Sequence, residues 1–121
     1  MKIKQLDYDF SICKVKDYSD INLNCEYFFI GKTDEENSLI CITQDIPDNI
    51  IEHDDNWRAF RLQGILDFSL IGILSNISSL LAKHQIGIFA VSTFNTDYIF
   101  IKKENLQKAL NVLSDSGYEI V

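Results

Sequence analysis

Proline is almost absent from this chain, with one residue in 121, and no apolar stretch reaches the roughly 20 residues that a membrane helix needs. The N-terminal run MKIKQLDYDFSICKVK alternates between polar and apolar residues, so it lacks the apolar core of a signal peptide. We therefore expect a cytoplasmic protein with no membrane partner. A content of 46% hydrophobic and 24% charged residues is typical of one globular body.

Cysteine and histidine are also scarce. Cys13, Cys25 and Cys41 are odd in number and lack CxxC spacing, which argues against a disulfide framework or a zinc site and favours buried thiols. His53 stands in the acidic run 52–55 without a second histidine or a cysteine nearby. The sequence predicts a solvated loop there and no metal site.

Basic residues are few and unevenly placed. Residues 1–55 hold 13 acids and 5 bases, whereas residues 56–121 hold 5 acids and 6 bases. A surface poor in Lys and Arg binds nucleic acid weakly, because it releases few counterions. No nucleic-acid partner is expected, which leaves a small ligand or a protein.

Known catalytic motifs are missing: the chain has no P-loop, no nucleophile elbow and no zinc-protease helix motif. Neither Ser69 nor Ser92 has a sequence neighbour that would act as its base. The sequence therefore predicts no enzyme, no catalytic residue, no metal and no cofactor.

The second half of the chain has a regular pattern of apolar residues. Helical spacing occurs at 68–84 and 104–114, and shorter runs predict strands at 57–63, 86–92, 98–102 and 118–121. The order β-α-β-β-α-β is ferredoxin-like, with helices on one face of an antiparallel sheet. Asp67 is expected to cap the first helix, Gly72 inside that helix suggests a close neighbour, and Gly117 should end the second helix.

The first half predicts three strands, at 9–16, 26–32 and 38–43, with a hairpin connection at 31–37. The remaining connectors are too short for long helices, and Pro47 interrupts the second of them. We expect a reduced copy of the same arrangement, whose last strand is shared with, or replaced by, the strand at Trp57.

Two polar segments lie within apolar sequence where one end of a sheet would bring them together. The first closes a strand and opens a helix, whose unpaired N–H groups and dipole suit a carboxylate. The second joins two strands and supplies Asp97, Asn95 and Thr96, which suit an ammonium group. The predicted ligand is a free amino acid, and the candidate residues are Gly64, Ile65, Leu66, Asp67, Phe68, Ser69, Ser92, Thr93, Asn95, Thr96 and Asp97. Ordinary roles as turn and capping residues remain the alternative for them.

These residues resemble the ACT domain family, and within it the small tandem-ACT proteins similar to the cellular arginine sensors of animals. The resemblance rests on WRAFRLQG (57–64), LDFSL (66–70), GIL (72–74), IFA (88–90), STF (92–94) and TDY (96–98), in this order. It implies an α+β fold of two ACT-like, ferredoxin-like lobes. A reduced N-terminal lobe would span residues 1–55, and a C-terminal ACT domain would span residues 56–121.

The resemblance also implies a regulatory or sensor protein that forms a homodimer and binds an amino acid or a related metabolite at a lobe interface. The end of the first helix departs from the family pattern, because residues 83–85 read Lys-His-Gln where relatives usually place a glycine. The alternative function is a dimerisation or protein-interaction module that binds no ligand.

Overall fold

The computed structural model describes residues 1–63 and 72–121. The chain divides into two compact units, which we name the N-terminal unit (residues 8–57) and the C-terminal unit (residues 1–7 and 58–121). Two long strands, β1 (Lys2–Val15) and β4 (Ile50–Leu62), contribute residues to both units. Among the residues described, no helix is long and apolar enough to cross a membrane.

The C-terminal unit has the predicted β-α-β-β-α-β order. Its elements after β4 are α1 (Ile73–Lys83), β5 (Ile88–Ser92), β6 (Asp97–Lys102), the 3-10 turn η2 (Lys103–Asn105), α2 (Leu106–Asp115) and β7 (Glu119–Ile120). The ferredoxin-like α+β prediction is confirmed for this unit.

One strand of its sheet was not predicted. The strand order is β7-β1-β4-β6-β5, so the first residues of the chain lie between β7 and β4. β7 pairs with β1 in parallel, with Lys2 opposite Glu119, which adds one parallel pair to the predicted antiparallel sheet. The Gln63 N–H donates to Lys2 O at 2.9 Å, which fixes β1 against the end of β4.

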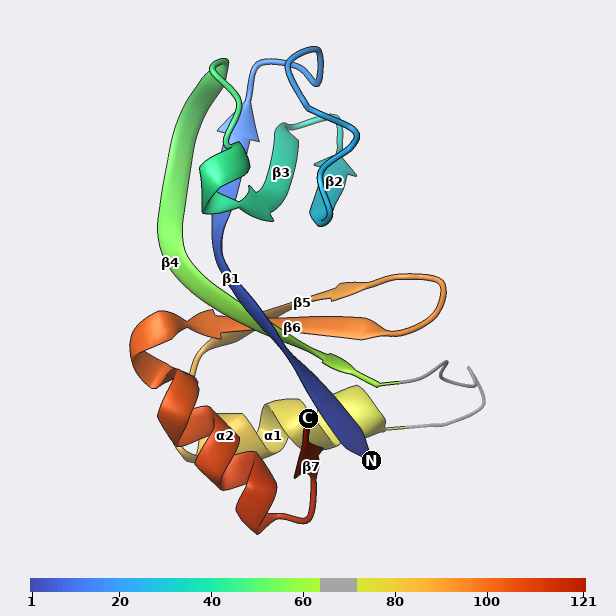
Figure 1. Cartoon of the computed structure of the whole chain (residues 1–121), viewed down its shortest axis with the longest axis vertical. Helices are drawn as coiled ribbons and strands as arrows, with labels where there is room; N and C mark the ends of the chain where they lie inside the picture. The colour runs from blue at the N-terminus through green and yellow to red at the C-terminus, as the bar shows by residue number, and fades with distance from the viewer. Residues whose placement is uncertain (64–71) are drawn as a thin grey trace. The chain divides into compact units, whose positions relative to one another are not determined.

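The core of the C-terminal unit lies between the sheet and both helices. Phe60 and Leu62 alternate along β4, so they point to one face of the sheet. Both are fully buried, together with Ile77 of α1 and Leu113 of α2. The two helices therefore cover the same face, side by side, as Figure 1 shows.

Helix α1 begins later than predicted. Its N-cap is Gly72, whose φ of 85° is left-handed, and no side chain among the described residues caps the helix. Within the same residues, a Cβ at Gly72 would meet nothing within 4 Å, so the left-handed backbone is the observed reason for a glycine here. Asp67, the predicted cap, lies outside the described residues.

Both helices end in the same hydrogen-bonded motif. After α2, Gly117 has a φ of 97°, and the Tyr118 N–H donates to Leu113 O at 3.1 Å. After α1, the equivalent residue is Gln85, with a φ of 61°, and the Ile86 N–H donates to Leu81 O at 3.0 Å. Gly117 ends its helix as predicted, whereas Gln85 adopts a conformation that favours glycine.

The N-terminal unit contains β2 (Phe28–Lys32), β3 (Asn37–Ile42), the 3-10 turn η1 (Thr43–Asp45) and parts of β1 and β4, in the strand order β2-β3-β1-β4. The predicted hairpin joins β2 to β3. Cys13 and Cys41 are buried with Val15 and Leu39, as predicted, whereas Cys25 is half-buried. The predicted loop at 52–55 is wrong, because these residues extend β4.

The two units contain the same hairpin, 60 residues apart. β2, β3 and η1 become β5, β6 and η2 when 60 is added to each residue number. The strand registers repeat as well, since Phe28 lies opposite Cys41 and Ile88 lies opposite Ile101. The turns also repeat: the Thr33 N–H donates to Glu36 O and the Thr93 N–H donates to Thr96 O.

Candidate functional site

The turn between β5 and β6 holds the described half of the predicted ligand site. Ser92 and Asp97 are cross-strand partners at the ends of the two strands, and the Ser92 hydroxyl donates to Asp97 Oδ1 at 2.6 Å. Between them, the N–H and the hydroxyl of Thr93 donate to Thr96 O, at 2.8 and 2.9 Å. The turn is held by its own side chains, and Asn95 is exposed at its tip.

Thr96 fastens this turn to the sheet. Its hydroxyl donates to Leu62 O at 2.7 Å, and the residue is 7% exposed. Leu62 is the last residue of β4, so the turn is fixed at the strand end that precedes the first predicted segment. The predicted residues of that segment, Gly64 to Ser69, lie outside the described residues.

Charged groups near the turn are divided between the two faces of the sheet. Side chains alternate along β6, so Asp97 lies on the face of Ile99 and Ile101, which the helices cover. Tyr98 faces the other way, and its hydroxyl accepts from Arg61 Nη1 at 3.5 Å. Because the Arg61 guanidinium lies on the opposite face, a ligand ammonium at Asp97 would not compete with it.

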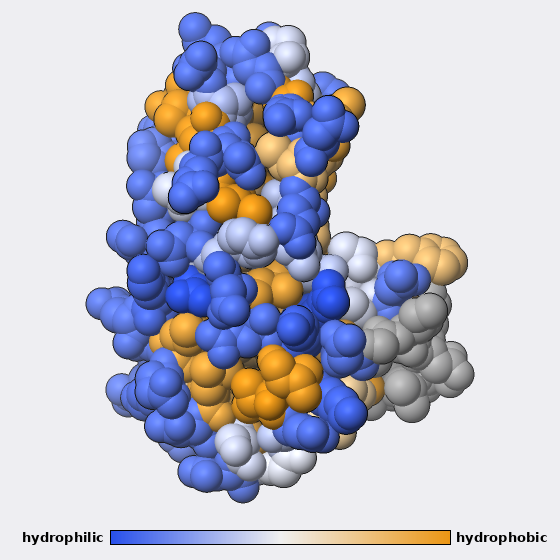
Figure 2. Space-filling view, in the orientation of Figure 1, coloured by the Kyte–Doolittle hydropathy of each residue, from blue (hydrophilic) through white to orange (hydrophobic). Residues whose placement is uncertain are grey.

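The tip of the turn also carries an aromatic ring. The side chain of Phe94 is 85% exposed, the highest fraction among the exposed large hydrophobic residues of the described chain. Figure 2 shows hydrophobic surface over this end of the β5–β6 hairpin. An exposed ring on a turn that is otherwise polar is a candidate contact for a ligand or for a protein partner.

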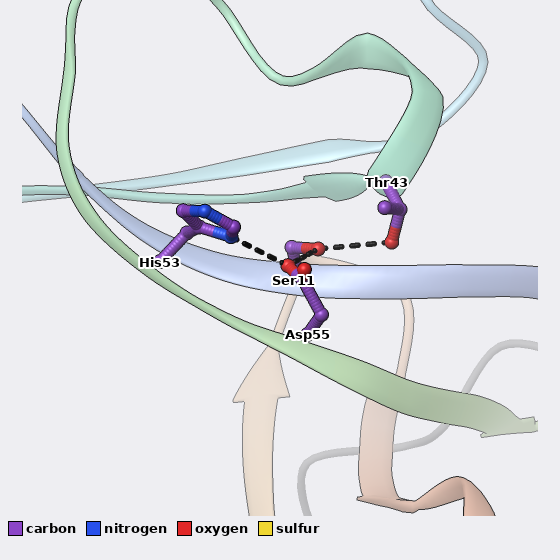
Figure 3. A network of polar contacts seen from close by, with 4 residues as sticks. All are labelled: Ser11, Thr43, His53 and Asp55. Atoms are coloured by element: carbon purple, nitrogen blue, oxygen red, sulfur yellow. Dashed lines mark hydrogen bonds and ion pairs between the residues drawn. The ribbon is translucent and has the colours of Figure 1, made fainter.

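A second polar cluster lies in the N-terminal unit. Ser11, fully buried in β1, donates its hydroxyl to Asp55 Oδ1 of β4 at 2.6 Å and lies 2.9 Å from the hydroxyl of Thr43 in η1. His53 Nδ1 lies 2.8 Å from the same Asp55 oxygen (Figure 3). The hydrogen bond and the charge of Asp55 raise the pKa of His53.

This cluster has the residue types of a serine hydrolase without its geometry. In a catalytic triad the histidine takes the proton of the serine, whereas here Asp55 binds both Ser11 and His53. Ser11 is also inaccessible to a substrate. This cluster could not be recognised from sequence patterns, because its members come from three separate segments of the chain.

The thiols do not form a nucleophilic site. The hydrogen bond with Cys13 and burial raise the pKa of Cys41, and burial and Asp45 raise the pKa of Cys25. The hydrogen bond from Cys41 lowers the pKa of Cys13, but Cys13 is 2% exposed within an apolar cluster. Oxidants and substrates therefore have little access to it.

A polar cavity of about 340 Å³ opens between the connectors of the N-terminal unit. Asp20, Asp45 and Asp48 line it with amide side chains and the Cys25 thiol. Over residues 1–63 and 72–121, however, no three His, Cys, Asp or Glu side chains are grouped so that they would hold a metal ion. The carboxylates of this cavity do not converge on one point.

Comparison with protein families identifies the family of this chain. The model of the ACT domain matches residues 52–115, which is more than half of the chain. The chain belongs to the ACT domain family. A comparison with curated proteins gives no match.

Several solved structures are similar to this chain. Protein Atu0741 from Agrobacterium tumefaciens is 28% identical, with a TM-score of 0.87 over 99% of this chain and 91% of that one. VC0802 from Vibrio cholerae, described as a possible transport protein, is 19% identical, with a TM-score of 0.73 over 94% and 88%. The regulatory subunit of aspartate kinase from Thermus thermophilus is 9% identical, with a TM-score of 0.64 over 97% of each chain. The last two show similarity of fold alone.

Proposed function

We propose that this protein is a non-catalytic ACT-type regulator or sensor that binds a free amino acid or a related metabolite at a lobe interface. The ligand carboxylate would bind the N–H groups of residues 64–69, and the ligand amine would bind Asp97 with help from Asn95. A cytoplasmic location fits a sensor of free metabolites. The fold similarity to a regulatory subunit of aspartate kinase, an enzyme of amino-acid metabolism by its name, supports the ligand class.

The observation that carries this proposal is the fixed carboxylate of Asp97. Ser92 holds one of its oxygens, Thr93 closes the turn, and Thr96 ties the turn to the end of β4. A preorganised carboxylate costs little ordering entropy when it binds an ammonium group. Charge-assisted hydrogen bonds to such a group are the strong ones.

We also propose that the chain consists of two ACT-like lobes at the predicted bounds 1–55 and 56–121, except that residues 1–7 pair within the second lobe. The first lobe lacks the helices of the second. The strand order β2-β3-β1-β4 of the N-terminal unit supports this, because it matches β5-β6-β4-β1 of the C-terminal unit strand for strand. The 60-residue repeat of the hairpins supports it as well. The similarity to tandem-ACT arginine sensors stays a prediction, and so does the identity of the amino acid.

The second candidate function is a protein-interaction or dimerisation module without a ligand. The exposure of Phe94 favours it, because rigid aromatic side chains are typical anchors of protein interfaces. The two functions are compatible if the ligand controls the interface, and they differ in whether a free metabolite stabilises the protein.

A thermal-shift screen with the twenty amino acids tests the proposal. A ligand at a hundred times its Kd adds about 2.7 kcal/mol to the unfolding free energy, so at least one amino acid should raise the melting temperature at millimolar concentration. Asp97→Asn should remove the shift, whereas Asp34→Asn, an exposed acid on the equivalent hairpin of the other unit, should keep it. No shift with any amino acid would favour the interaction module.

A further inference from the structure

The cluster of Ser11, Thr43, His53 and Asp55 joins three segments of the N-terminal unit through one carboxylate oxygen. Ser11 comes from β1, Thr43 from η1, and His53 and Asp55 from β4. Asp55 Oδ1 accepts from Ser11 at 2.6 Å and lies 2.8 Å from His53 Nδ1. Figure 3 shows both contacts meeting at this oxygen.

We propose that this cluster is a proton-controlled clasp. Protonated His53 holds Asp55 in place to accept the Ser11 hydroxyl, and the loss of the proton loosens β4 from β1 and η1. Ser11 is buried, so a departing Asp55 would leave its hydroxyl with Thr43 alone among the partners in the cluster. The clasp acts independently of the ligand site proposed above.

The charges around His53 favour its protonated form. On β4, Asp55 bonds to it and Asp54, on the other face of the strand, acts through its charge; on β1, the Cys13 thiol also favours the protonated form. The segment that carries η1 contributes the uncharged hydroxyl of Thr43. The N-terminal unit as a whole has 12 acids and 3 bases, a net charge of −9, which adds a general attraction for a proton.

The direction of the pH dependence follows from the raised pKa of His53 in the folded protein. Its stabilising contribution is complete below the unfolded pKa, near 6.5, and disappears as the pH rises through the higher folded value. The clasp is therefore closed in mildly acidic solution and loosened above neutral pH. The side chain of His53 is 42% exposed, so solvent reduces the effect.

Hydrogen exchange of the β4 amides 51–55 tests the clasp, after correction for the intrinsic pH dependence of exchange. From pH 5.5 to pH 8, the protection of these amides in the wild type should fall about two- to fivefold, the range of an exposed ion pair. His53→Gln keeps a hydrogen-bonding amide without the charge, and its protection should not change with pH. His84→Gln removes the histidine of the other unit and should behave like the wild type.

If protection of these amides falls equally in the wild type and in His53→Gln between pH 5.5 and pH 8, the proposal is wrong. It is also wrong if protection does not fall in the wild type. If His53→Gln does not fold, salt replaces it as the test, because 1 M NaCl reduces the Debye length to about 3 Å. The fall in wild-type protection should then become clearly smaller. An unchanged fall in high salt would also contradict the clasp.

Discussion

Single side chains decide how the β5–β6 turn is placed. Thr96 has a hydroxyl where a valine of the same shape would fit, and this hydroxyl is the donor to the buried carbonyl of Leu62. The turn chemistry of Ser92, Thr93 and Asp97 is local, so the sequence predicted a polar turn there. The tie to Leu62 joins residues 34 apart and could not be predicted from spacing.

Thr96→Val should therefore destabilise the protein by about 1–3 kcal/mol, because it leaves the Leu62 carbonyl without its donor while it preserves the volume. Urea unfolding measures the change. Thr33→Val is the comparison: the Thr33 hydroxyl is exposed and bonds with the backbone of its own turn, at Glu35 and Glu36, so its replacement should cost less, about 0.5–1 kcal/mol. Equal effects of the two substitutions would show that the buried bond to Leu62 contributes no more than exposed bonds within a turn.

Helices and strands were predicted most accurately where apolar periodicity is continuous. Helix α2 and strands β5 and β6 have nearly the predicted bounds. Helix α1 starts five residues later than expected, because the apolar pattern continues through Gly72 although the backbone there is left-handed. The first half of β4 was missed, since its run Glu-His-Asp-Asp-Asn lacks the β-branched and aromatic residues that mark strands.

The end of α1 offers a stabilising substitution. Gln85 has a φ of 61°, where a residue with a Cβ is strained, and glycine relieves that strain at some cost in unfolded-chain entropy. Gln85→Gly should raise the unfolding free energy by about 0.5–1 kcal/mol, measured by thermal or urea unfolding.

The matched opposite change is Gly117→Ala after α2, where the φ is 97°. A Cβ there meets nothing within 4 Å, so the penalty comes from the backbone alone. It should lower the unfolding free energy by about 1 kcal/mol. A destabilising Gln85→Gly would mean that the glutamine side chain makes a contribution larger than the backbone strain.

At the scale of the molecule, the family, the fold of the C-terminal unit and a reduced copy in the first half could be predicted, but the exact 60-residue register of the two hairpins could not. Between residues 28–45 and 88–105, only Phe29 with Phe89 and Thr33 with Thr93 are identical. The two hairpins share the pairing of their strands and not their residues, and many different apolar sequences can adopt the same pairing. A residue-by-residue comparison therefore does not detect the repeat. The edge strands β2 and β5 nevertheless differ in charge, and this difference predicts which of them forms a dimer interface.

The edge strand β5 (Ile88–Ser92) has no charged residue, whereas β2 ends in Lys32 and leads into three acids, which protect an edge from pairing. We therefore expect a homodimer through β5. Light scattering should give twice the monomer mass for the wild type and the monomer mass for Ala90→Arg. Ile30→Arg, at the equivalent position of β2, should remain dimeric. A monomeric wild type at high micromolar concentration would contradict this interface.

The central claim is that Asp97 binds the amine of a small metabolite, and calorimetric titration tests it most directly. Wild-type protein titrated with the amino acid that stabilises it most should give a saturable isotherm. Asp97→Asn should weaken the affinity about tenfold or more, because the ligand ammonium loses its charged partner; tenfold corresponds to about 1.4 kcal/mol. Asp34→Asn should bind as the wild type does. No heat with any amino acid at millimolar concentration, or equal affinities for wild type and Asp97→Asn, would contradict the claim.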